Sequence, residues 1–251
     1  MIVRCYSLLA IFCFSLGVVT AEDKADDFKA FAKLEKLGGK LIRDEEASNR
    51  PVVEIDFRGN KNFGNSSMQL IKAFPRLKTL TLSGTKVTDS GLKELRGMKK
   101  LSTLNLDGTR VTDVGVKELA NCKKLKTLNL NQTRITDSCL TEVALLKNLR
   151  ELQIEFTPIT DRGIDKLIEM TEMTTLSLRG TKVTDACIKR INELESLTHL
   201  DVAATQVTDR GLVELVDHKS LVVLNVRFCD QITGAGVSDL KKAIPELDIR
   251  R

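Results

Sequence analysis

A 24-residue internal repeat is the feature that most constrains how this chain can fold. The same phrase recurs seven times without a change of spacing, and one copy reads LKTLTLSGTKVTDSGLKEL from Leu77 to Leu95. The opening residues of repeats one to seven are Leu77, Leu101, Leu125, Leu149, Met173, Leu197 and Leu221. A diverged copy precedes them at residues 52–59, and a truncated copy follows at residues 247–249. Such self-similarity predicts an array in which each unit contacts only its neighbours.

The apolar period changes within each repeat. Leu80 and Leu82 alternate as in a short strand, whereas Leu92, Leu95 and Met98 recur every three residues as in a helix. One repeat cannot bury its own apolar face, so neighbouring repeats must stack with parallel strands on one side and helices on the other. We therefore predict an α/β solenoid over residues 51–251. Its strands should centre on Leu80, Leu104, Leu128, Leu152, Leu176, Leu200 and Leu224.

Composition limits the chemistry that this array can perform. Aromatic residues make up only 4% of the chain, there is no Trp, and the two histidines leave little material for imidazole catalysis or metal ligation. The formal net charge of +5 is weak and dispersed, which disfavours a nucleic-acid ligand. These features disfavour an enzyme and predict a core of aliphatic side chains.

The phrase Gly-Thr-x-Val-Thr-Asp-x-Gly-Leu after each strand resembles a leucine-rich repeat in its 24-residue form. It is similar to the repeats of secreted bacterial leucine-rich repeat proteins and of the cysteine-containing class. The resemblance implies a curved horseshoe with parallel strands on the concave face and helices on the convex face. It also implies that the chain binds another protein or peptide and needs no cofactor.

A threonine column and an aspartate row recur with the repeat. The threonine hydroxyls are expected to bond backbone groups of adjacent turns. The aspartates begin each helix, where Thr or Asp can satisfy free amides, and a calcium site is the alternative. Because calcium needs six or more converging oxygens, we predict no metal site. The two columns are Thr85, Thr109, Thr133, Thr157, Thr181 and Thr205, and Asp89, Asp113, Asp137, Asp161, Asp185 and Asp209.

Four cysteines follow residue 21, and each falls in a repeat column. Cys122 takes a core position, Cys139 and Cys187 replace a small glycine, and Cys229 ends the threonine column. Cys139 and Cys187 lie two repeats apart, which is about 10 Å and beyond the limit of about 7 Å for bridged Cα atoms. We expect free, buried thiols.

The segment before the repeats divides into two parts. Residues 1–21 carry a positive start, an apolar run and small residues around Ala21, which predicts a secretory signal peptide, with a retained membrane anchor as the alternative. Residues 22–50 are predicted to form a capping helix and a linker. Phe28, Phe31, Leu34 and Leu37 make its apolar face, Gly38 and Gly39 stop it, and a partner-binding helix is the alternative.

The candidate binding surface lies on the concave face of repeats four to seven. Outward strand positions of the first three repeats carry mostly small polar residues such as Thr and Asn, and the later repeats depart from this background. Phe156 and Phe228, which replace a glycine at the end of the strand, are candidate rim anchors, and local packing is the alternative. The candidate concave-face residues are Glu151, Glu155, Arg179, His199, Asp201 and Arg227.

A hydrolase is the remote alternative. Ser177 should neighbour Asp201 directly and His199 diagonally, at about 5 and 7 Å between Cβ atoms. A flat ladder of paired amides offers no oxyanion hole and no pocket that excludes water, so we predict no catalytic residue.

The sequence therefore predicts an exported, non-catalytic scaffold in the periplasm, the cell envelope or the medium. It should be a monomer that binds a protein or peptide, with no nucleic acid, cofactor or metal and no membrane insertion after signal cleavage. A structural component of the cell envelope is the alternative function.

Overall fold

The computed structural model describes residues 21–47 and 49–251. The predicted signal peptide lies outside these residues except for Ala21. Within the described chain, no helix is both long enough and apolar enough to cross a membrane.

The described strands form one ten-stranded sheet whose spatial order follows the chain from β1 to β10. Every pair from β2 onward is parallel, and Leu80 lies opposite Leu104 with Leu104 opposite Leu128. The predicted register, strand order and strand centres are confirmed. The strands are β1 (Lys40–Arg43), β2 (Val52–Asp56), β3 (Thr79–Thr81), β4 (Thr103–Asn105), β5 (Thr127–Asn129), β6 (Glu151–Gln153), β7 (Thr175–Ser177), β8 (His199–Asp201), β9 (Val223–Asn225) and β10 (Asp248–Arg250).

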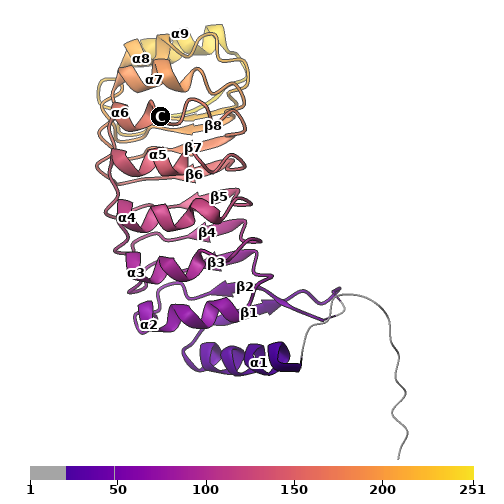
Figure 1. Cartoon of the computed structure of the whole chain (residues 1–251). Coiled ribbons are helices and arrows are strands. Elements are labelled where there is room, and N and C mark those ends of the chain that lie inside the picture. The colour runs from indigo at the N-terminus through magenta and orange to yellow at the C-terminus, as the bar shows by residue number, and fades with distance from the viewer. Residues whose placement is uncertain (1–20, 48) are drawn as a thin grey trace, which may run out of the picture.

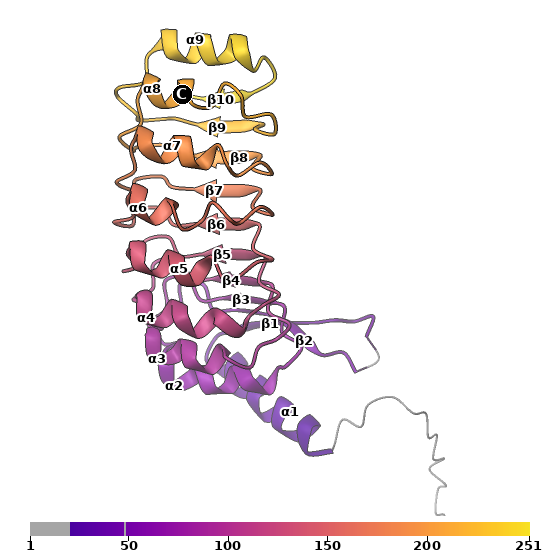
Figure 2. The ribbon, with the colours of Figure 1, turned by 45° about the horizontal axis from the view of Figure 1, so that its top comes forward.

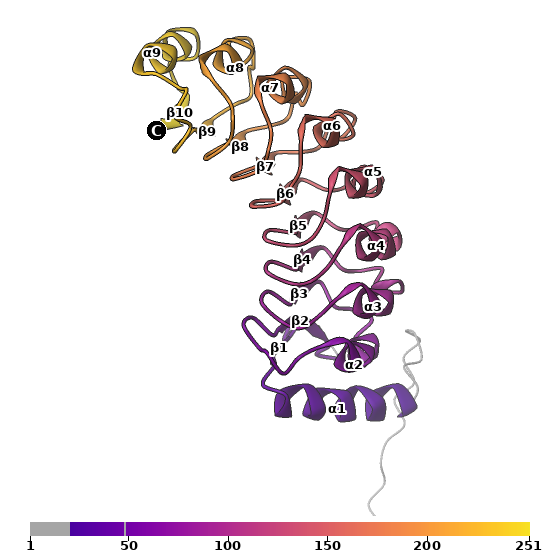
Figure 3. The same cartoon turned by 90° about the vertical axis from the view of Figure 1, so that its left-hand side faces the viewer.

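Helices cover the opposite layer, and the stack curves so that the strands lie on its inner side (Figures 1 and 3). Several helices are a single α turn that continues as 3₁₀ helix, because a 24-residue unit leaves few residues between strands. The α-helices are α1 (Ala21–Lys36), α2 (Asn65–Met68), α3 (Asp89–Leu92), α4 (Asp113–Val116), α5 (Leu140–Val143), α6 (Asp161–Ile164), α7 (Asp185–Ile191), α8 (Asp209–Val213) and α9 (Gly234–Ala243). The 3₁₀ helices span Gln69–Ala73, Lys93–Leu95, Lys117–Asn121 and Asp137–Cys139.

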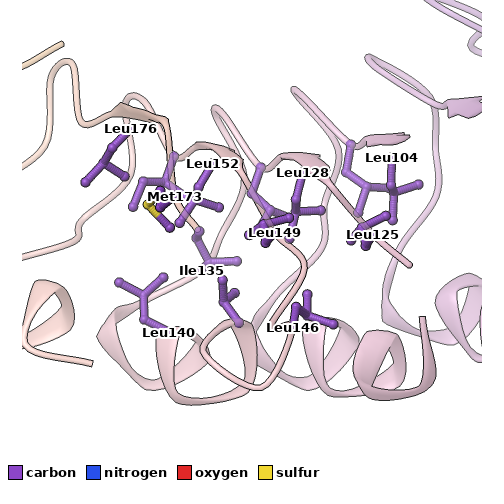
Figure 4. Close-up of a cluster of buried hydrophobic side chains, with 14 of the residues drawn as sticks. Leu104, Leu125, Leu128, Ile135, Leu140, Leu146, Leu149, Leu152, Met173 and Leu176 are labelled. Carbon is purple, nitrogen blue, oxygen red and sulfur yellow. The ribbon is translucent and has the colours of Figure 1, made fainter. Parts of the chain in front are cut away.

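The core is a continuous column of aliphatic side chains between the two layers. Leu104, Leu128, Leu152 and Leu176 stack one above the next behind the strands (Figure 4), and all four are fully buried. Strands only 3 residues long suffice because each repeat adds further buried aliphatic side chains from its turn and helix.

The threonine column is buried, but its hydrogen bonds differ from the expectation. Each hydroxyl donates to the carbonyl three residues earlier in the same repeat, as Thr85 Oγ1 does to Leu82 O at 2.7 Å. Thr133 Oγ1 bonds Leu130 O at 2.6 Å in the same way. The threonines therefore close the turn within each repeat, and a link between repeats occurs at the end of the column, where Thr205 Oγ1 lies 3.7 Å from Cys229 Sγ.

Helix α1 packs against the 3₁₀ helix Gln69–Ala73, which precedes repeat one (Figure 1), with Leu34 buried and Gly38 in a left-handed conformation (φ 85°) beyond the helix end. Phe28 was wrongly assigned to the apolar face, because its side chain is 70% exposed. The sequence did not indicate β1, which pairs antiparallel with β2 and protects the first edge of the sheet (Figure 2).

At the other end, the truncated copy forms β10, which pairs parallel with β9. The residues before it form α9, which spans 10 residues and is the last helix of the convex layer (Figure 2).

Candidate functional site

The candidate site begins at the turn that follows each strand. In repeat one, Thr85 N donates to Leu82 O at 3.2 Å, and the third residue of this turn, Gly84, has φ 66°. A turn with positive φ at its third residue normally requires glycine, because other side chains collide with the backbone there. Gly59, Gly108 and Gly180 occupy the equivalent position with φ from 64° to 73°.

Phe156 and Phe228 depart from this rule. Their φ angles are 53° and 59°, so two bulky side chains adopt the left-handed conformation that glycine takes in repeats one, two and five. Gln132 (φ 52°) and Ala204 (φ 54°) adopt it in repeats three and six. Their side chains are 51% and 69% exposed, respectively. Phe228 is thus mostly in solvent, whereas Phe156 is half-buried with its ring over Gly180, so the alternative of local packing applies to Phe156 in part.

Arg179 brings the two aromatic residues into one cluster. Its guanidinium carbon lies 5.7 Å from the ring centroid of Phe156 and 5.7 Å from that of Phe228, within the range of a cation–π contact. These three residues, here called the Phe–Arg cluster, come from repeats four, five and seven.

Small residues make room for the Phe–Arg cluster. A Cβ atom on Gly180 would lie 2.5 Å from Cδ1 of Phe156, so this ring lies directly over Gly180. Ala203, beside Arg179 in the ladder, is fully buried although its position faces the concave side, and Ala204 has φ 54°. These residues were not predicted as part of the site. The available signal was Ala203, a small apolar residue in an otherwise polar column.

The predicted glutamates belong to separate hydrogen-bonded pairs beside the cluster. Ser177 Oγ donates to Glu155 Oε1 at 2.8 Å. Gln153 Nε2 donates to Glu151 Oε1 at 2.6 Å, and Asn129 Nδ2 donates to Gln153 Oε1 at 2.8 Å. Glu151 is therefore part of a network across β5 and β6 and does not contact the Phe–Arg cluster.

The remaining predicted residues lie near the C-terminal end of the same face. Asn225 Nδ2 donates to Asp201 Oδ2 at 2.7 Å, and His199 Nδ1 lies 2.9 Å from Thr198 Oγ1. Both His199 and Arg227 are exposed.

Ser177, His199 and Asp201 do not form a catalytic relay. Ser177 lies opposite Asp201 as the register predicts, but its hydroxyl bonds Glu155. The carboxylate of Asp201 accepts from Asn225 and from the backbone of Ala203. The hydrogen bonds that would activate the serine are thus made to other partners.

A model of the family described as leucine-rich repeat region matches residues 61–240, which is more than half of the chain. The chain belongs to the leucine-rich repeat family. No curated protein matches it in sequence.

Two solved structures are similar to this chain. Internalin C2 from Listeria monocytogenes is 23% identical with a TM-score of 0.59, and the match covers 84% of this chain and 88% of that chain. The plant peptide hormone receptor RGFR1, solved in complex with RGF2, is 20% identical with a TM-score of 0.49 over 75% of this chain and 31% of its own. At 23% identity, the likeness to internalin C2 shows the fold alone.

The aspartate row of this leucine-rich repeat protein connects neighbouring repeats. Asp89 Oδ1 accepts from Thr112 N and Asp89 Oδ2 from Thr112 Oγ1, both at 2.7 Å, and the pattern recurs through the pair Asp209 and Thr233. The sequence left Thr or Asp as the residue that caps each helix, and this position belongs to threonines such as Thr112, with Asp113 in the first turn. The carboxylate oxygens are occupied by these donors, and the described residues contain no group of three or more His, Cys, Asp or Glu side chains able to hold a metal ion.

Proposed function

We propose that this chain is an extracytoplasmic, non-catalytic scaffold that binds a protein or peptide through the concave face of repeats four to seven. The observation that carries the proposal is the pair of exposed, left-handed phenylalanines that contact Arg179. The proposed surface comprises the Phe–Arg cluster with Glu151, Glu155, His199, Asp201 and Arg227.

Energetics favour a binding role for the two phenylalanines. A non-glycine residue in the left-handed region costs about 1 kcal/mol. Phe156 and Phe228 remain 51% and 69% exposed, so each ring keeps apolar area that a partner can bury. Strain of this kind persists at positions where it serves a function. Aromatic and arginine side chains also supply much of the energy of protein interfaces.

The first three repeats provide an internal contrast. Their outward strand positions are mostly Thr and Asn, as at Thr79, Thr103 and Asn105, and their strand ends carry Gly84, Gly108 and Gln132. No exposed aromatic ring lies among them, whereas repeats four and seven each present one. The binding surface is therefore assigned to the C-terminal half of the concave face.

Export and the absence of catalysis complete the proposal. The apolar run that ends near Ala21 supports cleavage of a signal peptide and release of a monomer from the membrane. The separate hydrogen bonds of Ser177 and Asp201 support a non-catalytic face. The weak net charge of +5 supports a protein or peptide ligand over nucleic acid.

Affinity capture with the full chain, expressed with a C-terminal tag in its native host, tests the proposal. We expect a discrete partner from envelope or medium extract, and a captured chain whose mass corresponds to a start at Glu22. Changing both Phe156 and Phe228 to glycine should abolish capture. The matched variant with Thr79→Ala and Thr103→Ala should retain it.

Unfolding in urea supplies the control for folding. Phe228→Gly should change the free energy of unfolding by less than about 1 kcal/mol, because relief of left-handed strain offsets the greater backbone entropy of glycine. Equal capture by the glycine and alanine double variants would refute binding at this face. A chain found only in insoluble envelope material, with no discrete partner, would instead support the structural alternative.

A further inference from the structure

We propose that the Phe–Arg cluster is a preformed receptor for an acidic side chain, carried by an extended peptide segment between apolar residues. The inference rests on the proposed function and specifies the chemistry of its ligand. The ligand carboxylate would bind the guanidinium of Arg179, and its apolar neighbours would pack on Phe156 and Phe228.

Arg179 lacks a polar partner in the free protein. Within residues 21–47 and 49–251 it forms no ion pair and its side chain makes no hydrogen bond, and its Nε is buried without a partner. Some arginines in the same part of the chain are paired, as Arg150 is with Glu172 and Arg190 with Asp165, whereas the exposed Arg227 is not. An unpartnered buried donor is costly, so a ligand that pairs with this guanidinium gains affinity.

The carboxylates closest to Arg179 in the ladder are already bonded elsewhere. Glu155, its neighbour in the preceding repeat, accepts the hydroxyl of Ser177 at 2.8 Å. Asp201 accepts from Asn225 and from Ala203 N. Neither carboxylate forms an ion pair with Arg179 in the described chain, so its guanidinium remains able to pair with a ligand carboxylate.

The geometry suits the paired oxygens of a carboxylate. A guanidinium is a planar fork of donors that matches a carboxylate, and the two aromatic contacts restrict its orientation before the ligand arrives. The terminal nitrogens make no internal hydrogen bond and are not among the buried unpartnered atoms, so they reach the surface. Partial desolvation by the rings strengthens the pairing.

Arg227 places a second positive charge on the same face, on the C-terminal side of Arg179. It lies two strands beyond Arg179 in the same outward row, which is about 10 Å, and it is exposed and without an ion pair in the described chain. Ala203 lies between them in this row and is fully buried. An acidic side chain placed between the two guanidinium groups would meet positive charge on both sides, whereas a basic one would be repelled.

Selection from a library of short random peptides tests the inference. The peptides are joined to a carrier at both ends, so no free terminal carboxylate is present, and the full chain is the target. We expect the selected peptides to share one Asp or Glu flanked by apolar residues. Changing that residue to its amide should weaken binding to the wild-type chain about tenfold.

Matched variants assign the effect to Arg179. Arg179→Gln should weaken binding of the acidic peptides about tenfold and make the protein insensitive to the amide change. Arg179→Lys, which keeps the charge but loses the planar fork, should recover only part of the loss. Arg134→Gln changes an exposed arginine in the turn of repeat three and should leave the affinity within about twofold.

The outcomes separate this inference from the proposed function. Peptides that require Phe156 and Phe228 but bind Arg179→Gln with unchanged affinity, or that share basic residues, would overturn the carboxylate receptor and leave the binding face in place. Failure to enrich any peptide over the variant with both phenylalanines changed to glycine would overturn the carboxylate receptor and the proposed function together.

Discussion

His218 occupies a core position that apolar side chains fill in the other repeats. The equivalent residues are Met98, Cys122, Leu146, Met170 and Leu194, and all are buried. The His218 side chain is only 4% exposed, and its Nε2 is buried without a partner. Burial lowers the pKa of His218, and its contacts with backbone carbonyls oppose this shift only partly. The folded protein therefore holds this imidazole in its neutral form.

The buried imidazole predicts a loss of stability in mild acid. Its pKa is lower in the folded state than the ordinary value of about 6.5, so the unfolded chain binds more protons as the pH falls below that value. The stability that the neutral imidazole contributes is complete above about pH 7, and it is lost as the pH falls from about 6.5 toward the pKa of His218 in the folded state. Urea unfolding at pH 7.5, 6.5 and 5.5 should therefore show a steeper decline for the wild-type chain than for His218→Met.

The second histidine provides the control for this prediction. His199 is exposed on β8, so His199→Gln should preserve the wild-type decline. Parallel declines for the wild-type chain and His218→Met would show that the buried imidazole does not set the acid response.

At the scale of elements, the aspartate row couples each helix to the next. Asp137 Oδ1 accepts from Thr160 N at 2.8 Å and its Oδ2 from Thr160 Oγ1 at 2.6 Å, so one carboxylate holds the residue that precedes α6. Asn65 makes the equivalent pair of bonds to Thr88 in the first repeat, where its amide nitrogen donates to the hydroxyl. Hydrogen-bond geometry at this position is thus compatible with Asp or Asn.

The coupling predicts different effects for two changes at one residue. Asp137→Ala removes both acceptors and leaves the Thr160 amide without a partner, so it should lower the free energy of unfolding by about 2 kcal/mol. Asp137→Asn can keep both bonds, as Asn65 does, and should cost less than about 1 kcal/mol. Chemical unfolding measures both. Equal losses in the two variants would indicate that carboxylate charge matters more than hydrogen bonding.

At the scale of the whole molecule, the solenoid is a linear stack in which only neighbouring repeats touch. Its terminal repeats have a neighbour on one side alone, so they open at a lower free-energy cost than central ones. Four buried, unpaired cysteines lie at different positions along the stack and can report this difference in opening. They run from Cys122 in repeat two through Cys139 and Cys187 to Cys229 in repeat seven. Burial raises the pKa of Cys122 to about 11, and it also raises the pKa of Cys139 and Cys187.

Thiol labelling, read peptide by peptide in a mass spectrometer, should follow position in the stack. Cys229, which is 6% exposed near the last strands, should react at least about tenfold faster than the fully buried Cys122, Cys139 and Cys187. All four should react after denaturation without reductant. A resistant pair would reveal a disulfide, and a central cysteine that reacts first would contradict opening from the ends.

The fold of this protein followed from residues that repeat, because the periods of strand and helix are local properties. Leu80 and its equivalents determined strand, register and parallel order, and the glycines after α1 marked its end. Strand β1 did not follow from this pattern, since it lies outside the repeat and pairs only because β2 offers a free edge. Phe28 also departed from its helical period because α1 meets the solenoid along a narrower stripe.

The sequence alone determined where the concave face departs from its background, but only tertiary structure decided which of those residues act together. Periodicity predicts that Arg179 and Phe228 lie on the same face, but it does not predict that one guanidinium contacts aromatic rings from repeats four and seven. It likewise placed the aspartates at the helix starts without revealing that they bond the next repeat. Local propensity determines backbone shape, whereas side-chain partners 23 or more residues apart are set by how the repeats stack.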